Sequence, residues 1–342
     1  MTQSFTIPFT QVLVGVVLVL GYGATACGPS QPLPGGNVLE GKVIFLDPGH
    51  GGTAETDDFR VGPTGEREEW VNLRVALTLR EMLEARGARV LMSRTEDVAV
   101  PLQERADSAV EHGADVFLSI HHNATADPAV SFPIIYFHGN ASENQASVAL
   151  GRSVARKLRE ALFAGETPVS LVSDHVIFPA AGAAVLRHSY GIPGVIGEAS
   201  FFTHPPEEER LKDPAYNRRE AEAYVAALEE FFALPELPIE EKYSTGQVPP
   251  FEVLQEGERM NVEAQRWQEN YLRALELMET GTPGALAEAS ELFTLSARSC
   301  PDSWVAAECH RHRAEILEAL GRHEEAEKER RRVREFYVPV AG

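Results

Sequence analysis

The sequence predicts an α/β domain that is followed by a smaller all-helical region. Apolar, strand-like runs alternate with helical segments between residues 41 and 233. Such alternation is typical of a mostly parallel or mixed sheet that is flanked by helices on both faces. Beyond a Pro-rich, polar linker at residues 234–257, residues 258–342 show only helical periodicity.

The expected strands are short apolar runs, and helical segments separate most of them. We expect strands at 43–46, 89–92, 116–120, 134–137 and 195–199, and helices at 70–86, 101–112, 144–162 and 214–232. The second helix has a proline near its start and Gly113 just past its end, which is the usual asymmetry of helix termini.

The helical region carries a weak internal repeat. A Leu–Gly spacing at 277–281 recurs at 317–321, each time before an Ala-containing helical segment. This pattern resembles degenerate tetratricopeptide repeats, and a small helical bundle without repeat ancestry is the alternative. Such repeats usually offer a binding surface, so we expect a protein partner on this region.

The composition excludes one class of partner. The formal net charge is −20. Nucleic-acid binding needs a basic footprint, so we expect no nucleic acid among the partners. With 44% hydrophobic and 24% charged residues the chain resembles an ordinary globular protein.

The first residues form an export signal. The apolar run at 12–20 is about half of the ~20 residues that span a bilayer, so it predicts a signal peptide rather than a permanent anchor. The small residues at 24–26 precede Cys27 and resemble a bacterial lipoprotein cleavage box, which makes 1–27 the signal peptide and Cys27 the lipidated residue. Plain secretion is the alternative. We expect a Pro/Gly-rich tether at 28–40, and a periplasmic protein with a lipid anchor in the outer membrane of a bacterium.

Two further cysteines, Cys300 and Cys309, lie in the helical region. In an oxidising compartment they can form a disulfide. Two free, buried thiols are the alternative.

Potential metal ligands follow the predicted strands. His50 comes after the first strand in a Pro/Gly turn, and His121 and His122 end the third. Glu68 and Glu69 stand directly before the first helix. Because residues past the carboxyl ends of parallel strands converge on one crevice, two imidazoles and one carboxylate can form a catalytic zinc site. A phosphate-binding loop is the weaker alternative for the glycine-rich turn.

Glu198 is a carboxylate inside the apolar run at 195–201. A buried carboxylate is costly unless it has a partner or a task. Beside a zinc site it can act as general base and then as general acid.

These blocks together resemble the type-3 family of zinc-dependent N-acetylmuramoyl-L-alanine amidases. The matching motifs are DPGHGG at 47–52, GERE at 65–68 before VNL at 71–73, SRT at 93–95 with LQER at 102–105, SIHHNA at 119–124, EASFF at 198–202 and LKDPAY at 211–216. The resemblance covers 41–233 and implies a fold of the zinc amidase or carboxypeptidase type.

Carried over by position, the resemblance makes His50, Glu68 and His121 the zinc ligands and Glu198 the catalytic carboxylate. Glu68 is preferred to Glu69 because it stands four residues before Asn72, as in the family.

The resemblance also assigns substrate contacts. Arg187 matches a family arginine near the cleft, and His122 and Asn123 are assigned to substrate binding, although His122 replaces a common alanine and packing is its alternative role. Asp47 is expected to shape the turn or support a ligand. The short stretch from His121 to Glu198 predicts no inserted helix that would block the site.

The implied reaction is hydrolysis of the amide between N-acetylmuramic acid and L-alanine in peptidoglycan, for wall remodelling or daughter-cell separation. Two rival functions remain. One is another zinc hydrolase, such as a carboxypeptidase or deacetylase. The other is a non-catalytic wall-binding lipoprotein.

Overall fold

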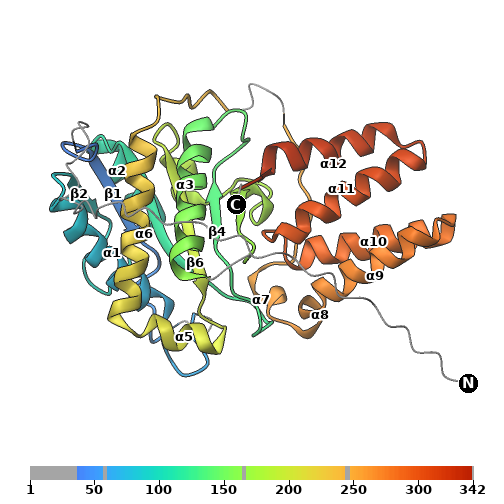
Figure 1. Cartoon of the computed structure of the whole chain (residues 1–342), viewed down its shortest axis with the longest axis horizontal. Helices are drawn as coiled ribbons and strands as arrows, with labels where there is room; N and C mark the ends of the chain where they lie inside the picture. Colours follow the sequence, from blue (N-terminus) through green and yellow to red (C-terminus); the bar gives the residue numbers. More distant parts are fainter. Residues whose placement is uncertain (1–36, 57–59, 164–166, 243–246, 341–342) are drawn as a thin grey trace, which may run out of the picture. The chain divides into compact units, whose positions relative to one another are not determined.

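The computed structural model describes residues 37–56, 60–163, 167–242 and 247–340, and these belong to one compact unit. Figure 1 shows a central sheet with helices packed against it and further helices formed by the last quarter of the chain. The predicted signal peptide, Cys27 and most of the predicted tether lie outside the described residues.

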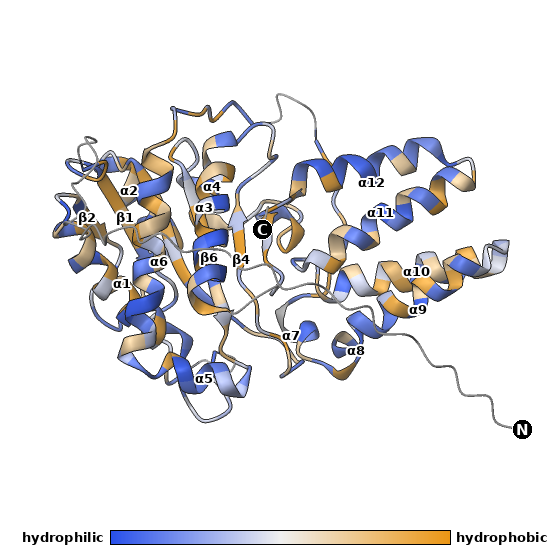
Figure 2. Ribbon diagram, in the orientation of Figure 1, coloured by the Kyte–Doolittle hydropathy of each residue, from blue (hydrophilic) through white to orange (hydrophobic). Residues whose placement is uncertain are grey.

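A seven-stranded mixed sheet forms the centre of the fold, in the order β2-β1-β3-β6-β4-β5-β7. The strands are β1 (Val43–Pro48), β2 (Arg89–Met92), β3 (Val116–Asn123), β4 (Ile134–Phe137), β5 (Ser170–Ser173), β6 (Gly194–Phe201) and β7 (Tyr337–Val338). Their apolar residues are almost all buried, and Figure 2 shows β1 as a hydrophobic strand within the sheet.

The strand directions decide which ends meet. β1, β2, β3 and β6 are mutually parallel, so their carboxyl ends share one edge of the sheet. β4 runs antiparallel to β6, and β5 is parallel to β4. A parallel crossover needs a connection of about a dozen residues or more, usually a helix. The segment between β3 and β4 contains no helix among its described residues, and the chain reverses direction there.

Three long helices cover one face of the sheet: α1 (Glu68–Glu84), α3 (Gln145–Leu162) and α6 (Pro214–Phe232). α6 packs against both α1 and α3. Each of these helices contributes residues to a core with the strands, among them Leu79, Leu158 and Leu228. The short helix α5 (Pro205–Leu211) precedes α6.

A second core lies on the other face and continues into the C-terminal helices. It joins Phe117 and Tyr136 of the sheet to Trp267 and Phe293 of the helical region. The contributing and neighbouring elements are α2 (Leu102–Glu111), a 3₁₀ turn at Asp174–Val176, α4 (Ala184–His188), α7 (Glu256–Arg259), α8 (Val262–Gln265), α9 (Trp267–Thr280), α10 (Pro283–Ser299), α11 (Trp304–Ala319) and α12 (His323–Phe336). Because this core is continuous, the helical region is part of the same hydrophobic interior as the sheet.

The observed elements confirm the α/β class with a mixed sheet and a helical C-terminal region. All five expected strands and the four expected helices of the α/β part are present, with shifted bounds. The sequence did not predict β5, β7, α4, α5 or α7. β7 follows α12 and pairs antiparallel with β5, through Leu171 and Val338.

The expected disulfide is not formed. Cys300 and Cys309 are both free and buried. Cys300 follows α10, where its Sγ lies 3.7 Å from Oδ1 of Asp302, whereas Cys309 lies in α11 and has Ser296 as a hydrogen-bond partner. Burial raises the pKa of both thiols to about 12, so they are small buried hydrophobic groups rather than reactive thiols.

Among the described residues, no helix combines the length and the apolar character needed to cross a membrane.

Candidate active site

The turn after β1 places His50 at the carboxyl edge of the sheet. His50 has a φ of 57°, which is the left-handed region that non-glycine residues seldom adopt. The next residues, Gly51 and Gly52, also have positive φ values, of 116° and 67°. Strained backbone of this kind persists only where the surroundings hold it, and it concentrates at functional sites.

Gly49 lets this turn approach the end of β3. A Cβ atom on Gly49 would lie 2.1 Å from Nε2 of His121. Any side chain at position 49 would therefore occupy the space of the His121 ring. The glycine before His50 is required by close packing of the two imidazoles, whose ring centroids are 4.7 Å apart.

Two buried arginines donate hydrogen bonds to the backbone of this turn. Nη2 of Arg94 donates to the carbonyl oxygen of Gly49 at 2.8 Å, and Nη2 of Arg105 donates to that of His50 at 2.6 Å. Arg105 also forms an ion pair with Asp47 at 2.8 Å. Asp47 accepts hydrogen bonds from Ser93, which follows β2, and from Ser119 on β3. It therefore links β1 to its two neighbouring strands rather than contacting His50. This is the turn-shaping role expected for Asp47.

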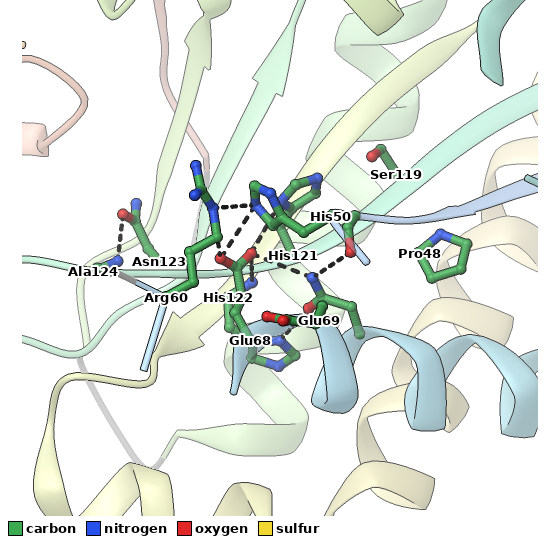
Figure 3. Close-up of polar contacts among 12 residues, drawn as sticks. Pro48, His50, Arg60, Glu68, Glu69, Ser119, His121, His122, Asn123 and Ala124 are labelled. Carbon is green, nitrogen blue, oxygen red and sulfur yellow. Dashed lines mark hydrogen bonds and ion pairs between the residues drawn. The ribbon is translucent and has the colours of Figure 1, made fainter. Parts of the chain in front are cut away.

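His50, Glu68 and His121 form one cluster, which Figure 3 shows with its hydrogen bonds. Nε2 of His50 lies 3.2 Å from Oε2 of Glu68, and Nδ1 of His121 lies 3.0 Å from Oε1. One ligand atom from each residue lies within 4.8 Å of the others. The cluster therefore has the two imidazoles and one carboxylate of a three-ligand catalytic zinc site.

Glu68, and not Glu69, belongs to this cluster. Glu68 begins α1 with its carboxylate directed at the histidines, whereas Glu69 is paired with Arg67 at 2.6 Å. Burial alone would raise the pKa of Glu68. The charge of His50 and the hydrogen bond to His121 outweigh that effect and hold its pKa well below the usual range. Glu68 is therefore an ionised, metal-ready carboxylate.

Glu198 faces the cluster from the neighbouring strand. In the β3–β6 pairing, Glu198 is the register partner of His121. Its Oε2 is buried and has no hydrogen-bond partner in the described part of the chain. Burial, followed by the charge of Glu68, raises the pKa of Glu198 well above its ordinary value. Two carboxylates whose pKa values are pushed apart are a common sign of acid–base chemistry.

His122 points away from His121, as adjacent residues of a strand do. Its side chain is fully buried, with Nδ1 donating to Oδ1 of Asn72 at 2.8 Å and Nε2 lying 3.1 Å from Oε2 of Glu220. Burial lowers the pKa of His122, but the charge of Glu220 outweighs this and raises it. Asn72 in turn donates to Glu68 at 3.2 Å. His122 therefore packs between α1 and α6 and supports Glu68 through Asn72, and its contact with substrate stays a prediction.

A cavity of about 450 Å³ contains the cluster and Glu198. Its remaining lining residues are Arg60, His122, Asn123, Ala124, Tyr136, Ile177, Phe178, Ile196, Phe202, Leu254, Gln255, Gly257, Arg259 and Met260. Asn123 carries a buried Nδ2 with no partner among the described atoms. Arg187 is not among the lining residues, and its guanidinium donates to the carbonyl oxygens of Ala181 and Gly182 at 3.1 Å.

Sequence reasoning missed Arg60 and the residues after position 253. Nε of Arg60 lies 3.2 Å from Nε2 of His50, and its side chain lines the cavity. Arg60 lies in an irregular loop without periodicity, so no sequence pattern marked it. The segment at 254–260 lies in and just after the predicted linker, where polar composition gave no sign of a role in the site.

A second group of potential ligands lies beyond the ends of β4 and β5. It comprises His138, Asp174 and His175. Asp174 accepts hydrogen bonds from Nδ1 of His138 at 2.8 Å and from the backbone of Ala183 at 2.7 Å. Because β4 is antiparallel to β6, this group is at the opposite edge of the sheet from His50. Lys242 lies within electrostatic range of Asp174 and supplies a positive charge there without a metal.

A mixed α/β sheet whose strands bring a His–Glu–His cluster and a facing carboxylate into one cavity has the arrangement of a hydrolase site that could hold a metal ion. The sequence profile of the protein family described as N-acetylmuramoyl-L-alanine amidase matches residues 44–230 of this chain. The chain belongs to this family.

Individual relatives agree with this assignment. The chain is 26% identical over 223 residues to the N-acetylmuramoyl-L-alanine amidase AmiA of Escherichia coli, covering 56% of this chain and 76% of AmiA. It is 31% identical over 187 residues to the amidase LytC of Bacillus subtilis, covering 55% of this chain and 35% of LytC. The crystal structure of an N-acetylmuramoyl-L-alanine amidase from Clostridium difficile 630 is similar with a TM-score of 0.51 and 26% identity, covering 58% of this chain and all of that one.

Proposed function

We propose that this protein hydrolyses the amide bond between N-acetylmuramic acid and L-alanine in peptidoglycan with the help of a bound zinc ion. The observation that supports this most is the location of His50, Glu68, His121 and Glu198 in one cavity. Family membership supports the substrate class.

The donor set fits zinc. Two imidazole nitrogens and one carboxylate oxygen are the ligands of several zinc hydrolases, and they leave a fourth position open. Asn72 and the backbone of His122 donate to Oε1 of Glu68, which orients the carboxylate. A bound Zn²⁺ lowers the pKa of water and polarises the carbonyl of a scissile amide.

The protein's own residues supply the proton transfers. Glu198 faces the cluster with an oxygen that has no partner in the described structure, so it is free to take a proton from the attacking water. The protonated Glu198 then donates this proton to the leaving amine of L-alanine. Nδ2 of Asn123, which has no hydrogen-bond partner among the described atoms, is available to donate to the substrate from the cavity wall.

Arg187 and His122 are placed differently with respect to the substrate. Arg187 does not line the cavity. It would therefore contact only a part of the substrate peptide that extends beyond the cavity. His122 supports Glu68 through Asn72. We retain Asn123 as the substrate-binding residue of this set.

Replacement of Glu198 tests the function. We expect Glu198→Ala to release stem peptides from purified peptidoglycan at least ~100-fold more slowly, because it lacks the general base, while it still binds one zinc per chain. The measurements are muropeptide release by mass spectrometry and metal content. Glu222→Ala on the exposed side of α6 is the matched control. Full activity of Glu198→Ala, or wild-type activity only on acetylated sugars or simple peptides, would contradict the proposal.

The biological setting is a further part of the proposal. We infer an exported, periplasmic enzyme that remodels the wall or separates daughter cells, anchored by lipid at Cys27, with the helical region binding a protein partner. The N-terminal apolar run and the cysteine after small residues support export and lipidation. Substitution of Cys27 by Ser should release the protein from membranes. Membrane retention of that variant would contradict lipid anchoring.

A further inference from the structure

The catalytic cavity has a wall that lies outside the family match. The matched segment ends at residue 230, whereas Leu254, Gln255, Gly257, Arg259 and Met260 all line the cavity. This wall, residues 254–260, comprises the end of the predicted linker, α7 and the residue after it. It is therefore a feature of this chain that the shared amidase domain does not supply.

A buried ionic network fixes the wall to the sheet. Nη2 of Arg259 donates to both carboxylate oxygens of Asp302 at 2.9 Å. The hydroxyl of Tyr136, on β4, donates to the same carboxylate at 2.6 Å. Asp302 is fully buried, and its two partners come from the wall and from the sheet. One carboxylate thus joins the C-terminal region, the wall and the strand beside β6.

Two further hydrogen bonds hold the ends of the wall. The backbone NH of Leu254 donates to the carbonyl oxygen of Arg298 on α10 at 3.0 Å. Just beyond the wall, Nε2 of Gln265 donates to the carbonyl oxygen of Ala126, in the loop after β3, at 2.7 Å. The wall is therefore attached to both the helices and the catalytic loops, which makes it a fixed surface.

The wall presents two apolar side chains to the cavity, those of Leu254 and Met260. Met260 is 38% exposed, and Phe178, which lines the same cavity from the segment after β5, is 48% exposed. Ile177, Ile196 and Leu254 line the same cavity. Exposed apolar groups inside a cavity that also holds catalytic residues are typical of a ligand-binding subsite.

We propose that Met260 and Phe178 form a subsite for the stem peptide of the substrate, beyond its first L-alanine. This rests on the proposed amidase function. The scissile bond joins a sugar acid to a peptide, so the substrate extends from the cluster in two directions. Methyl and methylene groups of a peptide fit an apolar surface, whereas a hydroxyl-rich sugar would lose its hydrogen bonds with water there. The flexible thioether of Met260 suits varied aliphatic groups.

The test compares two soluble substrates that differ only in peptide length. These are N-acetylmuramoyl-L-alanine and the same compound with a full pentapeptide. For Met260→Ser and for Phe178→Ser in the full chain, we expect KM for the long substrate to rise about fivefold to tenfold, with kcat nearly unchanged, because several buried methylene contacts are lost. Kinetics on the short substrate should not change.

Leu272→Ser is the matched control, because Leu272 is 59% exposed on α9 and does not line the cavity. An equal loss on both substrates would show a general structural effect and overturn the proposal, and so would unchanged kinetics on the long substrate. If the wild-type chain cleaves neither substrate, the amidase function itself fails, which is a distinct outcome.

Discussion

At the scale of single residues, the surroundings of Glu68 and Glu198 shift the pKa values of these two carboxyl groups in opposite directions. Glu68 is held ionised by the histidines beside it, whereas Glu198 has a raised pKa and a buried oxygen for which the described residues provide no hydrogen-bond partner. In the proposed mechanism, the same side-chain chemistry therefore provides a metal ligand in one position and an acid–base group in the other. A third carboxylate, Glu220, acts at a distance through His122 and Asn72.

The Glu220–His122–Asn72 chain should matter for metal affinity. In Glu220→Gln the acceptor charge next to His122 is lost, so the imidazole and Asn72 no longer orient Glu68 as firmly. Outer partners of metal ligands typically contribute 10-fold to 100-fold to affinity. We expect zinc affinity, measured by competition with a chelator, to fall by about that factor.

Glu222→Gln provides the control for this experiment. Glu222 lies two residues further along α6 and is exposed, so its replacement should leave zinc affinity unchanged. Equal affinities for the wild type and Glu220→Gln would mean that the buried chain only packs against the site.

The four main site residues could be predicted because each lies in a short local motif: a turn for His50, a helix start for Glu68 and an apolar strand for His121 and Glu198. His50, Glu68, His121 and Glu198 all reached the cavity as expected. The role of His122 was not predictable, because its partner Glu220 is 98 positions away in sequence. Contacts at such separation depend on packing that no local pattern encodes.

At the scale of elements, α11 and α12 are joined by a buried pair. Nδ1 of His310 lies 2.7 Å from Oε2 of Glu329, and Arg313 and Arg332 lie beside the carboxylate. Burial lowers the pKa of His310 to about 4. Burial alone would raise the pKa of Glu329, but its hydrogen bond to His310 and the nearby arginines lower it to about 2.

This pair should make the protein less stable in acid. The folded pKa of each group lies below its ordinary value, so the unfolded chain binds more protons as pH falls. The contribution of His310 is present above about pH 6.5 and disappears towards pH 4, and that of Glu329 disappears between about pH 4.5 and 2. We expect the free energy of unfolding, measured with urea, to fall by up to about 3 kcal/mol from His310 alone between pH 7 and 4.

His310→Gln should reduce this pH dependence, since glutamine does not titrate. His323→Gln is the control, because His323 is largely exposed and solvated in both states. If the unfolding free energies of the wild type and His310→Gln fall in parallel between pH 7 and 4, the buried histidine does not contribute.

The elements themselves were largely predictable where periodicity was clear. Long amphipathic helices such as α3 and apolar strands such as β1 follow their patterns closely. β7 has only two residues, and α7 only four, and both are stabilised by tertiary contacts rather than by their own sequence. Short elements of this kind carry too little periodic signal to be recognised.

At the scale of the whole molecule, the helical region and the sheet share one core. Trp267 and Phe293 pack in the same cluster as Phe117 and Tyr136, and β7 returns the chain to the sheet. The sequence predicted a linker between two domains at 234–257, because Pro-rich polar composition usually marks one. Composition could not show that the end of this stretch lines the cavity and packs against both parts.

A shared core predicts cooperative opening. In native-state hydrogen exchange on the full chain, we expect slow amides of β3 and of α10 to exchange with the same free energy, because neither can open without exposing the common interior. Exchange from α9–α12 at a clearly lower free energy, with β1 and β3 still protected, would contradict this.

The pairing of β7 with β5 also has a consequence for the order of assembly. Synthesis proceeds from the N-terminus, so the ligands at 50, 68 and 121 exist long before the wall at 254–260 and the strand at 337–338. Contacts that span such lengths of chain form late and slowly. The proposed metal ligands can therefore come together in a growing chain whose cavity still lacks one wall. The residues of the proposed peptide subsite meet only when the C-terminal helices pack against the sheet, so this subsite would be completed last during folding.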